Sequence, residues 1–363
     1  MVKIVQLLPE LNEGGVERGV VELNRELVKL GHESVVVSAG GKLASQIDKD
    51  GGKHIVSDIC SKNLFTAPLR MINLRKILTG VQPDIIHARS RVPAWLAYWA
   101  NRTLKIPFVT TVHGFNSVSA YSAIMTKGDR VICVSGAIRE YIQKHYNTPE
   151  EKISIIPRGI DLDKFNPEKT DHVFMESFKQ KYGLKEKFIV TTVGRITQLK
   201  DLETFIRAIA LLKKEMPHIT GVIVGGVRED KESYFESLKD LVERLHLEEH
   251  IVFTGSQSNV AEIYALSDVV VSSSKKPESF GRSVAEAIAM NRPVVATGHG
   301  GVLDIVKEGE NGFFYAVGEH KGLAENIVLA SRLFFDGYGY IATHFSLAQM
   351  VDKTLNVYKA VHK

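Results

Sequence analysis

The stretch Pro157-Arg-Gly-Ile-Asp-Leu-Asp-Lys-Phe-Asn-Pro167 divides the 363-residue sequence into two halves of similar design. A proline at each end and a glycine inside are typical of a linker between domains. On both sides of it, short β-branched runs alternate with longer segments of helical period. This alternation predicts βαβ units, and therefore a doubly wound parallel sheet in each half, covered by helices on both faces.

The expected elements follow from that alternation. Before the linker we expect strands at 3–8, 34–38, 84–87, 108–112, 130–134 and 153–156, and helices at 15–30, 69–78, 92–104 and 137–145. After it we expect strands at 187–193, 220–224, 251–253, 268–271 and 293–296, and helices at 202–215, 234–245, 261–266, 284–290 and 323–334. The prediction is an α/β fold of two facing Rossmann-like domains, 1–165 and 166–344. A last helix within 345–363 is expected to cross back to the first domain.

Composition and charge restrict the class of protein. Hydrophobic residues make up 44 % and charged residues 24 % of the chain, which is ordinary for a soluble protein. The first residues lack the form of a signal peptide, and no apolar run is long enough to span a bilayer. We therefore expect a cytoplasmic protein, at most attached to a membrane surface. Cys60 and Cys133 match no metal or redox spacing, so we expect reduced thiols.

The positive charge is concentrated in the first half. Residues 1–165 hold 22 Lys and Arg against 16 acids, whereas the remainder holds 24 against 26. Between 59 and 128, nine bases face a single acid, Asp84. This excess predicts an anionic partner for the first domain. Nucleic acid is disfavoured as that partner, because no nucleic-acid motif accompanies the charge.

The segment Lys276-Pro-Glu-Ser-Phe-Gly-Arg-Ser-Val-Ala-Glu286 carries the strongest functional signal. On one helix Glu278 and Glu286 would be about 12 Å apart, more than the roughly 5–9.5 Å between the two carboxyls of a glycosidase. We instead expect Glu278 in a loop and Glu286 inside a helix whose free N–H groups suit phosphate. Those N–H groups would come from Phe280, Gly281, Arg282 and Ser283. A ligand that carries hydroxyls, then a diphosphate, then hydroxyls would fill these three positions, and a nucleotide sugar has that layout. The alternative is a Pro-Glu turn that caps an amphipathic helix.

Two cations follow an expected strand end in Val193-Gly-Arg-Ile-Thr-Gln-Leu-Lys-Asp201. Fixed at that place, Arg195 and Lys200 can neutralise charge on a leaving diphosphate. Taken singly, each is better explained as a surface base at a helix start. Their occurrence together with the two glutamates favours the functional interpretation.

Three further motifs give weaker signals. Gly14-Gly15 opens the first helix and permits close backbone approach, but it lacks the G-x-G-x-x-G pattern of dinucleotide binding, and glycine as simple punctuation is the alternative. His113 ends a strand, where a lone histidine is more often a packing or hydrogen-bonding residue than a catalyst. Asp161-Leu-Asp163 matches a metal-binding pattern, yet it lies in a turn with no further ligand nearby. We therefore predict no metal.

With these segments in order, the chain resembles the family-four retaining glycosyltransferases of the GT-B fold over nearly its whole length. The specific part of the likeness is Gly194-Arg195 with Lys200, together with Glu278-x7-Glu286. The resemblance implies that Arg195 and Lys200 hold the donor diphosphate, Glu278 takes hydroxyls of the donor sugar and Glu286 takes the ribose hydroxyls. It also implies that the backbone from Phe280 to Ser283 approaches sugar and phosphate.

For the first domain, the resemblance implies that Gly15 lies against the diphosphate and that His113 lines the sugar pocket near the reaction centre. Transfer would retain the anomeric configuration without metal or cofactor, from a UDP- or GDP-linked sugar to a glycan or lipid-linked acceptor. The segments 87–95 and 121–130 further resemble bacterial lipopolysaccharide-core glycosyltransferases. Arg282 departs from the family, which usually has an apolar residue there.

Two other functions are compatible with the same scaffold. A sugar-nucleotide epimerase would need no acceptor, and a non-catalytic nucleotide-sugar sensor would release no nucleoside diphosphate. Glu278-x7-Glu286 with Arg195 and Lys200 favours transfer over both.

The sequence also predicts a membrane-facing surface on the first domain. Between Leu64 and Leu78, apolar residues lie beside Arg70, Arg75 and Lys76 at helical spacing, and Trp95 and Trp99 lie one turn apart on the next helix. The alternative is that Leu69, Ile72 and Ile77 cover the sheet and the bases form a solvated face.

Overall fold

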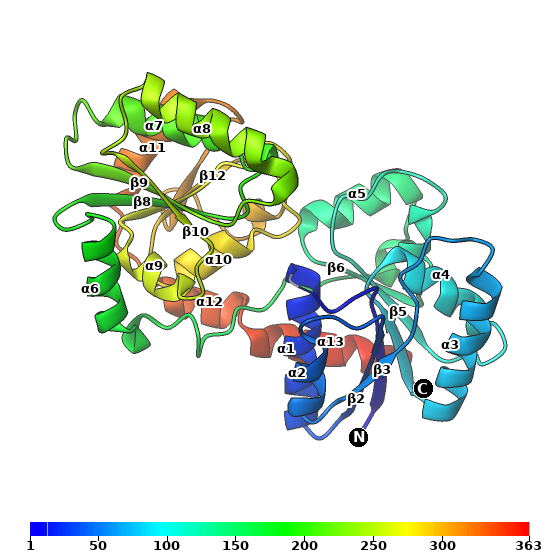
Figure 1. The fold of residues 1–363 in the computed structure, drawn as a ribbon. Helices are drawn as coiled ribbons and strands as arrows, with labels where there is room; N and C mark the ends of the chain where they lie inside the picture. The colour runs from blue at the N-terminus through cyan, green and yellow to red at the C-terminus, as the bar shows by residue number, and fades with distance from the viewer. Residues whose placement is uncertain (13, 363) are drawn as a thin grey trace. The chain divides into compact units, whose positions relative to one another are not determined.

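The chain folds into two compact units, each an α/β layer structure (Figure 1). The computed structural model describes residues 1–12 and 14–362. Unit 1 comprises Met1–Gly159 and the C-terminal segment from Leu347 on, and unit 2 comprises Ile160–Ser346. The chain thus passes from unit 1 to unit 2 inside the proline-bounded stretch 157–167.

Unit 1 is built on a seven-stranded sheet whose strands are all parallel, in the order β3-β2-β1-β4-β5-β6-β7. The central strands are apolar and buried on both faces, which is the pattern of a sheet covered by helices on both sides. Its strands and helices are β1 (Lys3–Leu7), α1 (Gly15–Lys29), β2 (Glu33–Ser38), α2 (Ala44–Lys49), β3 (Lys53–Val56), α3 (Ala67–Val81), β4 (Ile85–Ala88), α4 (Arg91–Ala100), β5 (Phe108–Val112), β6 (Arg130–Cys133), α5 (Gly136–Tyr146) and β7 (Ile153–Ile155).

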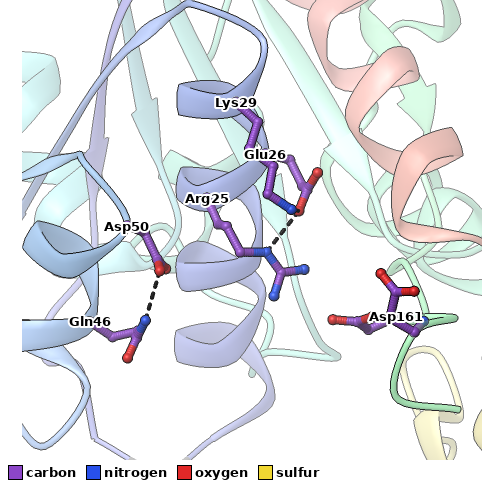
Figure 2. Close-up of polar contacts among 7 residues, drawn as sticks. Arg25, Glu26, Lys29, Gln46, Asp50 and Asp161 are labelled. Atoms are coloured by element: carbon purple, nitrogen blue, oxygen red, sulfur yellow. Dashed lines mark hydrogen bonds and ion pairs between the residues drawn. The ribbon is translucent and has the colours of Figure 1, made fainter.

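Capping residues and side-chain pairs stabilise the helices of unit 1. α5 begins where Ser135 caps it by accepting a hydrogen bond from the Ile138 amide, and it ends at Asn147 in the left-handed conformation. On α1, Glu26 accepts from Arg25 Nε at 2.7 Å and from Lys29 Nζ at 3.0 Å (Figure 2). Burial raises the pKa of Glu26, but these two cations outweigh it and lower that pKa overall. Gln46 likewise bonds to Asp50 across one turn of α2 (Figure 2).

The last helix, α13 (Leu347–Val361), completes unit 1, as the sequence predicts. It lies along α1 (Figure 1) and covers one face of the sheet. Its apolar residues pack with core residues of α1, β1, β4, β5 and β6 in one cluster: Ile4, Leu23, Leu27, Ile85, Val109, Ile132, Leu347, Val351, Leu355 and Tyr358.

Unit 2 contains a second parallel sheet, in the order β10-β9-β8-β11-β12-β13. The helices α7, α8 and α11 pack on one face and α9, α10 and α12 on the other (Figure 1). The elements are α6 (His172–Lys181), β8 (Phe188–Val193), α7 (Leu202–Leu212), β9 (Ile219–Val224), α8 (Glu232–Arg244), β10 (Ile251–Gly255), α9 (Val260–Leu266), β11 (Val269–Ser272), α10 (Arg282–Ala289), β12 (Val294–Thr297), β13 (Gly312–Tyr315), α11 (His320–Ala330) and α12 (Gly337–His344).

The prediction of two parallel-sheet α/β domains is therefore confirmed. Within the described part of the chain, no helix combines the length and apolarity that crossing a bilayer requires.

Candidate functional site

Glu278 of unit 2 lies in a network with Lys200 and Ser274. Lys200 Nζ forms an ion pair with Glu278 Oε1, and Ser274 Oγ donates to the same oxygen at 2.6 Å. Burial raises the pKa of Glu278, but Lys200 and Ser274 outweigh burial and lower it overall. The carboxylate is therefore ionised at neutral pH, and it is an acceptor for hydroxyl groups rather than a proton donor.

The loop that carries Lys200 is fixed against the segment after β11. Ser273 Oγ donates to the Lys200 carbonyl at 2.6 Å, and the Lys275 amide donates to the Leu199 carbonyl at 2.8 Å. The lysine side chain passes over Gly194, where an added Cβ would come within 2.9 Å of Lys200 Cε. A side chain at position 194 would collide with Lys200, which explains why a glycine precedes this lysine in the motif.

The start of α10 lies beside this network and has no side-chain cap. Gly281 precedes the helix with φ +101°. A Cβ on Gly281 would lie 2.7 Å from Val302 Cγ1, so the position requires glycine for space as well as for conformation. Phe280 is buried beneath the turn, whereas Ser283 is half-buried. An uncapped N-terminus is suited to an anion.

The loop at Gly300-Gly301, which the sequence reasoning missed, packs against the turn at 278–281. Gly301 donates its amide to the Glu278 carbonyl at 2.7 Å, and Gly300 has φ +76°. A Cβ on either glycine would lie 2.5 Å from a carbonyl oxygen of residue 278 or 279. The dipeptide Gly300-Gly301 after β12 was a usable signal, because two successive glycines after a strand mark a close backbone approach.

Glu286 lies on the first turns of α10, as predicted, and it has two polar neighbours. Arg282 Nε is 3.6 Å from Glu286 Oε1, and Tyr264 donates its hydroxyl to Oε2 at 3.3 Å. Burial and the adjacent Glu286 raise the pKa of Tyr264 well above its ordinary value, so the phenol remains a donor. Arg282, the departure from the family pattern, thus neutralises Glu286 in this structure.

Arg195 is not drawn into the network. Its side chain is exposed at the end of β8, and among the described residues no ion pair or hydrogen bond of its guanidinium is found. Of the two predicted cations, the structure therefore brings only Lys200 to Glu278.

The predicted residues of unit 1 also come together, around an arginine that sequence reasoning missed. Arg158 Nη2 is 3.5 Å from His113 Nδ1, and an added Cβ on Gly15 would lie 2.4 Å from Arg158 Nη1. Burial, followed by Arg158 and Arg89, holds the pKa of His113 well below its ordinary value. Because a guanidinium only donates, His113 Nδ1 accepts, and the proton of the neutral ring is assigned to Nε2. The ring is therefore a hydrogen-bond donor at neutral pH rather than a general base.

Asp161 and Asp163 form a turn, in which the Asp163 amide donates to Asp161 Oδ1 at 3.1 Å. Across the described ranges, 1–12 and 14–362, no three His, Cys, Asp or Glu side chains are grouped so as to hold a metal ion.

Comparison with known proteins places this geometry in a family. Residues 13–164 match the model described as Glycosyltransferase Family 4, and residues 174–332 match Glycosyl transferases group 1. The crystal structure of a glycosyltransferase from Rickettsia africae ESF-5 is 30 % identical, covers 100 % of this chain and 99 % of that one, and has a TM-score of 0.92. The chain belongs to the GT-B glycosyltransferases. The family predicted from the sequence motifs is thereby confirmed.

Two further relatives of this glycosyltransferase are informative. The N-acetyl-alpha-D-glucosaminyl L-malate synthase of Bacillus anthracis is 27 % identical over 333 residues, covering 85 % of this chain and 83 % of that protein. Anabaena HepE, solved in complex with UDP-glucose, is 20 % identical with a TM-score of 0.85 and covers 99 % and 100 % of the two chains. At that identity, the likeness to HepE shows the fold alone.

Proposed function

We propose that this glycosyltransferase moves a sugar from a UDP- or GDP-linked donor to a hydroxyl of a cell-envelope glycan or lipid-linked acceptor. The observation that carries the proposal is the ionised Glu278, paired with Lys200 and placed before the uncapped start of α10. A carboxylate at Glu278, an uncapped helix start and a second carboxylate at Glu286 follow one another along this segment. That order supports the binding of sugar hydroxyls, diphosphate and ribose hydroxyls, with unit 2 as the donor-binding unit and unit 1 as the acceptor unit.

In the proposed reaction, the bond between the anomeric carbon and the donor phosphate oxygen breaks, and a bond to the acceptor oxygen forms on the same face. The acceptor proton passes to the leaving phosphate, so the configuration is retained and no metal is required. Lys200 and Arg195 neutralise the charge that develops on the diphosphate. Glu278 orients the sugar through its hydroxyls, and neutral His113 donates to a sugar oxygen through Nε2–H.

Paired carboxylate variants test the donor assignment. Glu278→Ala should abolish transfer, because the sugar loses its orienting acceptor. Glu286→Ala should mainly weaken donor binding, by about 10- to 150-fold, as expected for the loss of charged hydrogen bonds. Glu310→Ala is the matched control, since among the described residues that exposed carboxylate forms an ion pair with Lys307 alone, at 3.8 Å. Near wild-type kinetics in the first two variants would refute the site.

Product analysis tests the reaction class. The donor is first chosen by thermal-shift screening against UDP- and GDP-sugars, and acceptors are then tried with it. Acceptor-dependent release of nucleoside diphosphate, with an α-linked product from an α-linked donor by NMR, is the expected result. An isomerised sugar nucleotide in the absence of acceptor would indicate an epimerase instead, and binding without any turnover would indicate a sensor.

We also propose that unit 1 docks on an anionic bilayer where a lipid-linked acceptor is presented. An apolar groove of about 500 Å³ lies between the N-terminal part of α3 and α4, lined by Leu64, Met71, Val92, Trp95, Leu96 and Trp99 among others. Leu64, which lines the groove, is 83 % exposed, and Phe65, the next residue in the chain, is 96 % exposed. Exposed apolar groups beside bases are the composition of a membrane-contacting surface.

Two details of the sequence interpretation are corrected by the structure. Leu69 and Ile72 are exposed, so they do not cover the sheet, whereas Ile77 packs against the core. The buried apolar residues of α3 are Leu74 and Leu78. Arg70 is buried and donates to the carbonyls of Ser61 and Asn63, which makes it a structural residue rather than a lipid contact. The exposed bases of α3 are Arg75 and Lys76.

Co-sedimentation with phosphatidylglycerol vesicles tests the docking. Binding should appear at low salt, weaken at 0.5 M salt, and fall about 30-fold in Arg75→Ser/Lys76→Ser, at roughly 1 kcal/mol for each base. The charge-matched control Lys185→Ser/Lys214→Ser changes unit 2 and should leave binding unchanged. Absence of binding at low salt, or equal binding by the two double variants, would refute the docking proposal. The acceptor would then be expected to be soluble.

A further inference from the structure

Arg89, at the end of β4, is a buried cation without an acidic partner. The residue is 8 % exposed, and its Nε has no hydrogen-bond partner. Nη1 approaches only the two ring nitrogens of His87, each at 3.5 Å. No carboxylate among the described residues forms an ion pair with it. Burial lowers its pKa to about 10, so the guanidinium still carries its charge at neutral pH.

The two histidines beside Arg89 do not supply the missing negative charge. Burial, followed by Arg89 itself, holds the pKa of His87 well below its ordinary value, so that ring is neutral. His87 is already engaged, at 2.6 Å to Tyr358 Oη and at 2.6 Å to Thr111 Oγ1. His113 is neutral as well, and Arg158 lies on its other side.

A cavity of about 300 Å³ gives access to this cation within unit 1. Its walls include Arg89, Ser90, Arg91, His113 and Asn116. α4 begins at Arg91 with no side chain capping its N-terminus, so free backbone N–H groups add to the positive field. Two carboxylates, Glu10 and Glu17, also line the cavity; Glu10 bonds to Asn12 at 2.8 Å.

Burying a guanidinium with an unsatisfied donor costs free energy of folding, because the charge loses its hydration without gaining a full set of partners. An anion in the cavity would satisfy both the charge and the free Nε–H, with the bidentate geometry that arginine offers to phosphate and carboxylate.

We propose that Arg89 binds a phosphate or carboxylate group of the acceptor, and thereby selects acidic acceptors. The assignment to the acceptor rests on the proposed transferase function, whereas the anion site itself does not require turnover.

The first experiment compares two buried arginines by thermal denaturation without ligand. Arg70 is the matched control, because three acceptors satisfy it: Ser61 O at 2.6 Å, Asn63 O at 2.5 Å and Thr66 Oγ1 at 3.3 Å. Arg70→Met should lower Tm, since it breaks those bonds. Arg89→Met should raise Tm, since it removes a buried charge with which no described residue forms an ion pair. A loss of Tm in Arg89→Met as large as in Arg70→Met would make Arg89 structural and overturn the proposal.

The second experiment measures binding of inorganic phosphate, at constant ionic strength, by calorimetry. Affinity should fall about 10- to 150-fold in Arg89→Met, as for lost charge-assisted hydrogen bonds, and partly recover in Arg89→Lys. Lys185→Gln, which changes an exposed base of unit 2 outside the donor site, should keep the wild-type response. Equal phosphate binding by the wild type and Arg89→Met overturns the proposal.

UDP and GDP identify the source of the anion. Arg89→Met should keep the wild-type nucleotide affinity while losing phosphate binding and raising KM for an acidic acceptor. If Arg89→Met loses nucleotide binding as well, the site belongs to the donor diphosphate and the acceptor assignment is wrong. Failure of the transferase proposal appears separately, as no nucleotide binding in any of the proteins.

Discussion

Gly281 offers a quantitative test of how the start of α10 is built. Alanine there must adopt φ +101° and place its Cβ 2.7 Å from Val302 Cγ1. The left-handed backbone costs about 1–2 kcal/mol, and the overlap in a packed core costs a further 1–3 kcal/mol, roughly. Gly281→Ala should therefore lower the free energy of unfolding of unit 2 by about 2–5 kcal/mol. It should also weaken donor binding, because the helix start must shift to relieve the contact.

The control is Gly318→Ala, where φ is +78° and nothing lies within 4 Å of the added Cβ. It carries only the backbone cost, about 1–2 kcal/mol. The double variant Gly281→Ala/Val302→Ala should recover part of the steric cost, which a double-mutant cycle isolates.

Urea denaturation can follow unit 2 separately. Both tryptophans, Trp95 and Trp99, belong to unit 1. A transition seen by circular dichroism but not by tryptophan fluorescence therefore reports unit 2. Equal losses of stability in Gly281→Ala and Gly318→Ala would refute the steric argument. Unchanged donor affinity in Gly281→Ala would show that the start of α10 does not bind the donor.

Three shorter predictions follow from other features. Because the folded pKa of Glu278 is lowered, its contribution to stability is present above its ordinary value of 4.5 and is lost as the pH falls through the folded pKa. Acid titration of unfolding should therefore be steeper below pH 4.5 in the wild type than in Glu278→Gln, and parallel curves would contradict this. Tyr358→Phe removes the partner of His87 Nδ1 and should cost unit 1 about 1–3 kcal/mol, measured by tryptophan fluorescence; no loss would mean that the bond contributes nothing. Transferase activity should survive exhaustive chelation with EDTA, because Lys200 and Arg195 supply the countercharge, and a strict need for Mg²⁺ or Mn²⁺ would disprove the mechanism.

The central strands could be predicted from the sequence because both of their faces are covered. β4 and β11 are continuous buried runs, Ile-Ile-His-Ala and Val-Val-Val-Ser, and such runs between helical segments have few other interpretations. The strands β3 and β13 were missed. Each is an edge strand of four residues whose burial is partial. The sequence of β3, Lys-His-Ile-Val, lacks the continuous apolar pattern, and β13, Gly-Phe-Phe-Tyr, begins with a glycine, a residue that is depleted in strands.

The candidate site shows a similar limit. The positions of Glu278, Gly281 and Glu286 around a helix start followed from spacing within one segment. The ion pair of Glu278 with Lys200 joins residues 78 apart in the chain, and no local pattern encodes it. The prediction for Arg70 was wrong in the opposite direction. A base on an expected helix is predicted to be exposed, but Arg70 is buried because carbonyls of the loop 61–66 accept its hydrogen bonds. Arg158 lies in the linker, and no pattern in the sequence predicts that its guanidinium occupies the space beside Gly15.

The chain order of unit 1 has a consequence for biosynthesis. Ile4, Leu23, Leu27 and Ile85 are covered by α13, which the ribosome makes only after the whole of unit 2. Residues 160–346, 187 in all, are translated in the interval, which lasts about 10–40 s at 5–20 residues per second. Throughout that time the nascent first unit exposes one apolar face of its sheet, whereas the second unit is continuous in sequence and can close on itself as it emerges. The nascent chain should therefore require chaperone protection at the α13-binding face, and a stop codon before residue 347 should yield an aggregating product rather than a shortened enzyme.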